Sequence, residues 1–156
     1  MEALRCGKRG CVMPSAVAFQ PSGSTLVGAP ARRRRAMDPK NTVLSAKRII
    51  GARWNSSYVK QFREHYPYEL LPSEDGGAAF GTRGGAFTPV EIGSRVIAGL
   101  TELTGCTFEG THAVVTAPVG FDERRRIATA RAAADLDFER VRVVEEPVAT
   151  ALAYLN

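Results

Sequence analysis

The sequence predicts an α/β fold, in which helices alternate with short parallel strands. Valine-rich runs at 112–117 and 141–144 have the character of strands, and the segment 122–137 between them has the character of a helix. Strands joined by a helical crossover pair in parallel with a right-handed connection. Ligands of such sheets bind beyond the carboxyl ends of the strands. Those ends carry Thr116-Ala117-Pro118 and Glu145-Glu146-Pro147, so we expect both to line a site.

Length and composition limit the class of protein. The chain has 156 residues, 44% of them hydrophobic, which is enough for one domain with a real core. No apolar run approaches the roughly 20 residues of a membrane-spanning helix. Residues 1–12 have no apolar stretch of the kind that a secretory signal needs. Three cysteines cannot form a complete disulfide framework, which favours a reduced, cytoplasmic compartment.

The chain is basic, with a formal net charge of +5. Much of the excess lies in two arginine runs, 32–35 and 124–126, and each run sits in a segment where it can form a solvated helix face. Basic charge without interleaved aromatic side chains is weak evidence for nucleic-acid binding. We therefore expect neither a nucleic acid nor a membrane as partner.

The remaining elements follow from local signals. Pro21 to Ser24 form a turn cluster, so the strands on either side should make a hairpin. Thr88, Pro89 and Glu91 have the spacing of a capping box at the start of a helix, and Asp122 is positioned to cap another. The expected strands are 16–19, 25–27, 68–71, 78–80, 86–87, 112–117 and 141–144, and the expected helices are 29–37, 43–50, 56–66, 89–104, 122–137 and 148–155.

Several chemical motifs are weak in this sequence. The glycine-rich stretch 81–85 lacks the Lys-Ser/Thr of a phosphate-binding loop and is typical of a turn between strands. Cys106 and His112 are too few for a zinc site, and no nucleophile elbow is present. The acid–base candidates are Asp122, Glu123, Glu145 and Glu146. Glu145-Glu146 is the more suggestive pair, because acidic residues at the carboxyl end of a parallel strand lie where a metal-bound phosphate or water could be held. A simple helix-capping role for Glu146 is equally open.

Seven segments together resemble the 70-kDa heat-shock (DnaK-like) chaperone family. They run in the family's order from about Pro14 to Tyr154. The segments are Pro14-Ser-Ala-Val-Ala-Phe19, Leu26-Val-Gly28, Asn41-Thr-Val43 with Ala46-Lys-Arg-Ile-Ile-Gly51, Thr88-Pro-x-Glu-Ile92, Val115-Thr-Ala-Pro118 with Phe121, Arg126-x-Ala-Thr129, and Glu146-Pro-x-Ala-x-Ala-Leu-Ala-Tyr154.

This resemblance implies a part of the family's nucleotide-binding domain, which has the actin-like, ribonuclease H-like ATPase fold. Residues 1–13 would be an irregular N-terminal segment and residues 14–156 the partial nucleotide-binding domain. Within that domain, about 16–87 would be a small β-rich and helical insertion lobe, and about 88–156 a helix plus the βαβα part of the core lobe. Lys47 and Glu146 match the family's catalytic residues, Glu146 acting through magnesium-bound water rather than as a direct metal ligand. Arg48, Pro118 and Arg126 match residues that bind nucleotide or relay its state to the substrate domain.

The implied function is that of a chaperone ATPase, which couples binding and hydrolysis of ATP with Mg²⁺ to binding of unfolded polypeptides. J-domain cochaperones and nucleotide-exchange factors are the implied partners. The family's two phosphate loops do not occur in these residues, so we expect a fragment with weak stability and poor binding of ATP or ADP by itself. The alternative is a truncated, catalytically incompetent homologue that acts as an interaction module or is a remnant.

The sequence departs from the family's pattern at three places. Gly120 stands where the family has an aromatic residue two positions after the proline. Glu145 replaces an asparagine, and Asp122-Glu123 replaces an Asn-Asp pair. These changes fall on the relay rather than on the residues that imply the fold.

Overall fold

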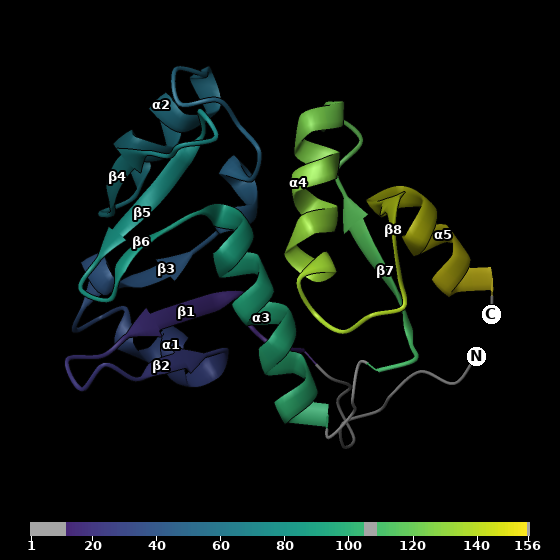
Figure 1. Ribbon diagram of the computed structural model, residues 1–156, viewed down its shortest axis with the longest axis horizontal. Coiled ribbons are helices and arrows are strands. Elements are labelled where there is room, and N and C mark those ends of the chain that lie inside the picture. The colour runs from purple at the N-terminus through teal and green to yellow at the C-terminus, as the bar shows by residue number, and fades with distance from the viewer. Residues whose placement is uncertain (1–11, 105–108, 156) are drawn as a thin grey trace.

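The computed structural model describes residues 12–104 and 109–155 (Figure 1). We call residues 12–104 the N-terminal region and residues 109–155 the C-terminal region. The two regions lie side by side, and helix α3 (Pro89–Thr104) runs along the boundary between them. Most of the expected irregular segment 1–13 lies outside the described residues. None of the helices described is long and apolar enough to cross a membrane.

The first sheet of the N-terminal region has the strand order β2-β1-β3 and is antiparallel throughout. Strand β1 (Ala16–Phe19) pairs with β2 (Thr25–Val27), which confirms the predicted hairpin. Its other edge pairs with β3 (Thr42–Leu44) in a register that sets Val17 opposite Val43. Helix α1 (Ala29–Arg34) and the short 3₁₀ turn η2 (Pro39–Asn41) connect the hairpin to β3.

The helix expected at 43–50 is wrong. Residues 42–44 form β3 and residues Ala46–Ile49 form the 3₁₀ helix η3, with Ser45 in a left-handed conformation between them. Thr42 and Val43 are β-branched and fully buried against β1, and such side chains pack well on a pleated surface. Pairing with a distant strand therefore decides the structure of a segment whose local pattern also fits a helix. Asn41 does not cap a helix, because its side chain joins Asp38 and the backbone N–H of Arg83.

The second sheet has the order β4-β5-β6, again antiparallel. It is built from β4 (Glu69–Pro72), β5 (Ala78–Thr82) and β6 (Gly85–Phe87), and the glycine-rich stretch 81–85 is confirmed as the turn between the last two. Helix α2 (Ser57–His65) precedes this sheet, and the Ser56 hydroxyl caps it by accepting a hydrogen bond from the Val59 N–H at 3.4 Å.

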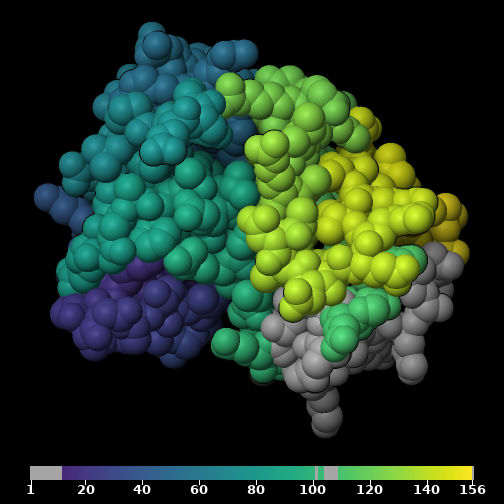
Figure 2. Space-filling view, in the orientation of Figure 1, coloured from purple at the N-terminus to yellow at the C-terminus, as the bar shows by residue number. Residues whose placement is uncertain are grey.

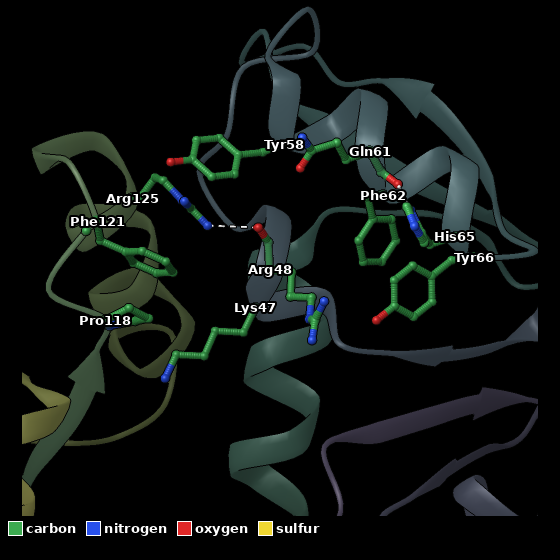
Figure 3. A pocket seen from close by; sticks show the side chains of 11 residues that line it. Lys47, Arg48, Tyr58, Gln61, Phe62, His65, Tyr66, Pro118, Phe121 and Arg125 are labelled. Atoms are coloured by element: carbon green, nitrogen blue, oxygen red, sulfur yellow. Dashed lines mark hydrogen bonds between the residues drawn. The ribbon is translucent and has the colours of Figure 1, made fainter.

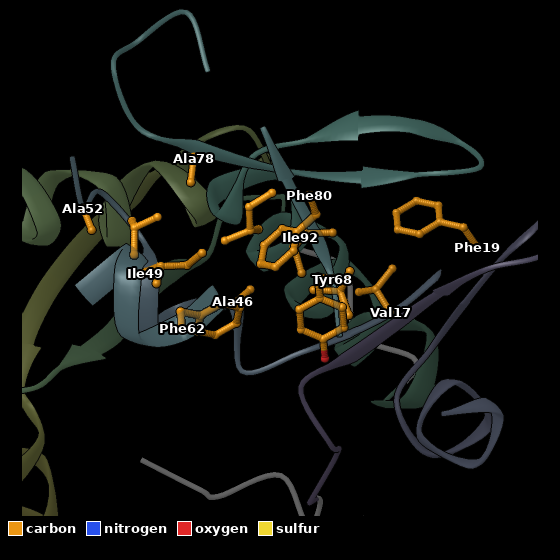
Figure 4. Packing of buried hydrophobic residues seen from close by; sticks show 13 residues of the cluster. Val17, Phe19, Ala46, Ile49, Ala52, Phe62, Tyr68, Ala78, Phe80 and Ile92 are labelled. Atoms are coloured by element: carbon orange, nitrogen blue, oxygen red, sulfur yellow. The ribbon is translucent and has the colours of Figure 1, made fainter. Parts of the chain in front are cut away.

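Aromatic side chains fill the core between these elements (Figure 4). The Phe80 ring is fully buried and meets the rings of Phe62 and Tyr68 edge-on, with centroids 6.0 and 5.5 Å away. The Tyr68 hydroxyl accepts a hydrogen bond from the Leu44 N–H at 2.8 Å, which ties the second sheet to the end of β3. The N-terminal region thus has a core of its own.

The C-terminal region is the predicted strand–helix–strand–helix unit. Strands β7 (His112–Ala117) and β8 (Arg140–Glu145) pair in parallel, with Ala117 opposite Glu145 at their carboxyl ends. Helix α4 (Glu123–Ala134) connects them, and the Asp122 carboxylate caps it by accepting from the Arg125 N–H at 2.9 Å. Helix α5 (Glu146–Leu155) follows β8 directly and has no buried residue.

Helices α3 and α4 join the two regions. The predicted capping box is present at the start of α3. Glu91 Oε2 accepts hydrogen bonds from the Thr88 N–H and hydroxyl, and the Glu91 N–H donates to Thr88 Oγ1. Where the helices meet, a Cβ added to Gly93 would lie 2.9 Å from Ala132 Cβ, and the Ser94 hydroxyl donates to the Ala132 carbonyl. Figure 2 shows the resulting contact as a seam between the teal N-terminal mass and the green-to-yellow C-terminal mass.

Candidate functional site

The two regions each contribute one charged side chain to a pair at their junction. The Lys47 ammonium lies 2.5 Å from Glu146 Oε1, although the residues are 99 positions apart in the sequence. Lys47 comes from η3, and Glu146 is the first residue of α5, directly after the carboxyl end of β8. Both side chains are nearly half exposed, at 44% and 45%. A pair this exposed contributes only about 0–1 kcal/mol to folding, so stability alone does not explain its position.

A short, sharply bounded segment carries Lys47 and Arg48. It begins at Ser45, whose φ of 60° is the one positive φ of a non-glycine residue among the described residues. It ends at Gly51, with a φ of +65°, where an added Cβ would lie 2.8 Å from both Ala128 Cβ and Arg125 Cα. Left-handed backbone and the close approach of α4 therefore fix both ends of the segment.

A cavity of about 540 Å³ opens beside this segment (Figure 3). Lys47 and Arg48 line it from η3, Pro118 and Phe121 line it from the turn after β7, and side chains of α2 close the far side. Gly120 also lines the cavity, and a Cβ added there would meet nothing within 4 Å. The lack of a side chain at position 120 therefore leaves this part of the cavity open.

The predicted relay residues lie on two sides of the pair. Arg48 and Pro118 share the cavity with Lys47. Arg126 does not line it; its guanidinium instead lies 3.4 Å from Glu145 Oε1, one residue before Glu146. The carboxylates at the end of β8 thus divide, with Glu145 toward α4 and Glu146 toward η3. His112, considered above as half of a metal pair, lies near Glu139, and Cys106 is outside the described residues.

Arg125 is the residue of this site that the sequence reasoning missed. The run 124–126 was interpreted as a solvated face, which is wrong for Arg125, because its side chain is only 4% exposed. Its guanidinium lies 3.8 Å from the centre of the Phe121 ring and 4.4 Å from that of Tyr58. Burial lowers the pKa of this guanidinium from its ordinary value. Phe121 stands four residues before Arg125, a spacing at which side chains at the start of a helix can contact each other. This spacing is the sequence signal that indicates a contact between Arg125 and a ring.

No group of three or more His, Cys, Asp or Glu side chains gathers into a metal-binding cluster within the described parts of the chain. Among the described residues, none that lines the cavity is acidic, and the carboxylate that reaches Lys47 is that of Glu146, directly after the end of β8.

Comparison with known proteins decides the family. A profile described as Hsp70 protein matches residues 6–155, nearly the whole chain. The chain belongs to the Hsp70 family. This confirms the predicted resemblance and implies the actin-like ATPase fold, with which the mixed α/β architecture agrees.

Curated relatives of the Hsp70 family agree with this assignment. The chaperone protein DnaK of Thermus thermophilus is 37% identical over 145 residues, which are 92% of this chain and 23% of that protein. The mitochondrial heat shock 70 kDa protein of Dictyostelium discoideum is 34% identical over 153 residues, 97% of this chain and 23% of its own length. Heat shock protein hsp-6 of Caenorhabditis elegans is 36% identical over 144 residues, 90% and 22% of the two chains. The chain therefore spans about a quarter of the length of these Hsp70 relatives.

Proposed function

We propose that this chain is part of the ATPase unit of an Hsp70 chaperone, which couples ATP hydrolysis to binding of unfolded polypeptides. The observation that carries the proposal is the Lys47–Glu146 pair, which joins two regions at the carboxyl end of β8 beside an open cavity. That is the edge of a parallel sheet at which ligands bind.

The side chains at this junction suit a phosphate chain and its magnesium ion. The Lys47 ammonium and the Arg48 guanidinium supply positive charge, and the Glu146 carboxylate is an oxygen group of the kind that holds magnesium-bound water. Bound Mg²⁺ would neutralise charge on the phosphate oxygens. No direct protein ligand to the ion is proposed.

Within this function, Lys47 would act by electrostatic stabilisation. Because its ion pair with Glu146 is exposed and weak, the ammonium can turn to a phosphate oxygen at little cost. A positive charge held where negative charge develops lowers the barrier to phosphoryl transfer. Glu146 would orient the attacking water through its carboxylate, which sits at the favourable N-terminal end of a helix.

The relay would run through the residues that flank this pair. Pro118 ends β7 beside Lys47, and Arg126 reaches Glu145, the neighbour of Glu146. Loss of the terminal phosphate would thus change the contacts at the carboxyl ends of both β7 and β8. J-domain cochaperones, nucleotide-exchange factors and unfolded polypeptides are the partners we propose on the basis of family membership. A cytoplasmic location stays a prediction, since one of the relatives is mitochondrial by name.

The test needs a full-length context, because the chain covers only part of the family's length. The matched 145-residue segment of the Thermus thermophilus DnaK is replaced by this chain's own, and ATP turnover of the chimera is measured. We expect the chimera to hydrolyse ATP and Glu146→Ala to slow it at least about tenfold, as loss of a group that handles the reacting water does. Glu64→Ala, an exposed change on α2, is the matched control and should have no effect.

Two results would count against this function. Equal turnover of the Glu146→Ala and Glu64→Ala chimeras would remove Glu146 from the chemistry. A folded chimera that binds polypeptide but hydrolyses no ATP would instead favour the catalytically incompetent interaction module.

A further inference from the structure

The three arginines at the start of α4 reach three different segments. Arg124 Nη2 donates to the Asp75 carbonyl in the loop between β4 and β5, at 2.8 Å. Arg126 reaches Glu145 at the end of β8. Arg125 alone reaches the segment that carries Lys47: its Nη2 donates to the Arg48 carbonyl at 2.8 Å and its Nε to the Ile50 carbonyl at 3.2 Å.

These two contacts add side-chain donors to the hydrogen bonding of the segment's backbone. The carbonyls of Ser45, Lys47 and Ile49 each accept a backbone N–H from three residues further on. The Arg48 carbonyl, between Lys47 and Ile49, and the Ile50 carbonyl, directly after Ile49, accept the guanidinium. The bond to the Ile50 carbonyl is buried and the bond to the Arg48 carbonyl is part-buried. A carbonyl removed from water without a donor is costly, so the Arg125 side chain supplies donors that the short 3₁₀ helix lacks.

The guanidinium is itself held in one orientation. Figure 3 shows the ring of Tyr58 on one side of it and the ring of Phe121 on the other, with the bond to the Arg48 carbonyl drawn between them. Tyr58 comes from α2 and Phe121 from the turn after β7, so the two stacking contacts come from both regions. A planar fork between two rings has little freedom to choose other acceptors.

We propose that Arg125 is a positioning residue, which fixes the Lys47 segment on helix α4 and so sets the distance between Lys47 and Glu146. The segment begins in the left-handed conformation of Ser45, which by itself is unfavourable and persists only where the surroundings enforce it. Arg125 provides that enforcement further along the segment, at Arg48 directly after Lys47 and at Ile50 directly before Gly51. The consequence for turnover rests on the proposed function, but the geometric role does not.

The first measurement is backbone amide hydrogen exchange in the 156-residue chain, comparing wild type with Arg125→Met. We expect exchange at the Arg48 and Ala52 amides to become at least about tenfold faster, because the segment loses its two side-chain donors. Amides of β5 and β1 should be unaffected. Arg124→Met is the matched control: it is one residue away on the same helix and also donates to a backbone carbonyl, but it should leave the Lys47 segment unchanged.

The second measurement reports the Lys47–Glu146 contact itself. Carbodiimide coupling joins an amine and a carboxylate only when they touch, and peptide mapping gives the yield of the Lys47–Glu146 link. We expect this yield to fall severalfold in Arg125→Met, to be partly restored in Arg125→Lys, and to stay at the wild-type level in Arg124→Met. If Arg125→Met does not fold, the comparison is made between Arg125→Lys and Arg124→Lys.

Unchanged exchange and an unchanged link in the Arg125 variants would overturn the proposal. So would faster exchange of all amides in equal measure, because Arg125 would then be a general structural residue. A wild-type chain that gives no Lys47–Glu146 link would count against the proposed function, whereas the exchange measurement would still decide whether Arg125 holds the segment.

Discussion

The N-terminal and C-terminal regions are stabilised in different ways. The N-terminal region has its own aromatic core, in which Phe80 is fully buried against the rings of Phe62 on α2 and Tyr68 directly before β4. In the C-terminal region the buried residues are few and small or polar, and all but Ala117 lie on α4; they are Ala117, Arg125, Ala128, Thr129, Ala132 and Ala133. The N-terminal region is therefore stabilised by its own hydrophobic core, and the C-terminal region by the packing of helix α4 against its neighbours.

This difference matters for the site. Lys47 belongs to the N-terminal region and Glu146 to the C-terminal region. Their contact therefore depends on how well α4 packs against η3 and α3. In this contact Gly51 lies against Ala128 and Gly93 against Ala132, which allows the backbones to approach closely there. The two regions should therefore respond differently to substitution, most strongly at buried leucines and least at a buried tyrosine.

The largest contrast is between leucines in the two regions. Leu70 on β4 is 7% exposed, whereas Leu155 on α5 is 81% exposed. We expect Leu70→Ala to lower the free energy of unfolding by about 2–5 kcal/mol, because a cavity remains in a packed core. Leu155→Ala should change it by less than about 0.5 kcal/mol. Urea unfolding followed by circular dichroism measures both, and equal losses would show that the two regions share one core.

The second contrast concerns the packing of Gly51 against helix α4. Gly51→Ala combines a left-handed φ with a Cβ that would lie 2.8 Å from α4 atoms, and we expect a loss of about 2–4 kcal/mol. Gly76 has a similar φ of +74° with open space around it, so Gly76→Ala should cost only about 1 kcal/mol. If the two variants melt at the same temperature, the close approach at Gly51 is not what joins the regions.

The third contrast is between the caps of α2 and α4. Asp122 accepts the Arg125 N–H at 2.9 Å and carries a negative charge, while Ser56 accepts the Val59 N–H at 3.4 Å. We expect Asp122→Ala to cost about 1–2 kcal/mol and Ser56→Ala about 0.5–1 kcal/mol. Thermal unfolding of the two variants gives the ranking, and a larger loss for Ser56→Ala would reverse the comparison.

The smallest effect is the alkaline response of the N-terminal core. Burial raises the pKa of Tyr68 above its ordinary value near 10, although the bond from the Leu44 N–H partly opposes this. The unfolded chain therefore loses this proton first, and stability falls as the pH rises from about 10 toward the folded pKa. We expect Tyr68→Phe to flatten that loss and Tyr154→Phe, at an exposed ring, to leave it unchanged. Unfolding midpoints measured across this pH range test the prediction, and identical slopes for wild type and Tyr68→Phe would contradict it.

Most of the fold could be predicted from local patterns, because local patterns determined it. The caps at Thr88 and Asp122 and the hairpin at Pro21 to Ser24 depend on residues close together in the sequence. The parallel strands β7 and β8 each have a valine-rich pattern within their own few residues. Strand β3 could not be predicted in this way, since Val43 suits a strand only once β1 lies beside it.

The site residues also differ in whether the sequence could predict them. Lys47, Arg48, Glu146 and Pro118 were proposed from a family resemblance, and the structure brings them to one junction. Arg125 escaped notice because its acceptors are 75 and 77 positions away. The run of like charges around Arg125 favours a solvated face, and the spacing to Phe121 is the one local sign of a ring contact.

The most direct test of the whole account is a single-turnover measurement on the DnaK chimera carrying Lys47→Ala, with Lys60→Ala on α2 as its control. We predict that Lys47→Ala slows the chemical step by about 10²–10³-fold, as removal of a group that stabilises developing charge does. Nucleotide affinity should change far less, and Lys60→Ala should alter neither. A chemical step at the wild-type rate in a folded Lys47→Ala chimera would contradict the account, because the contact between the two regions would then serve no catalytic purpose.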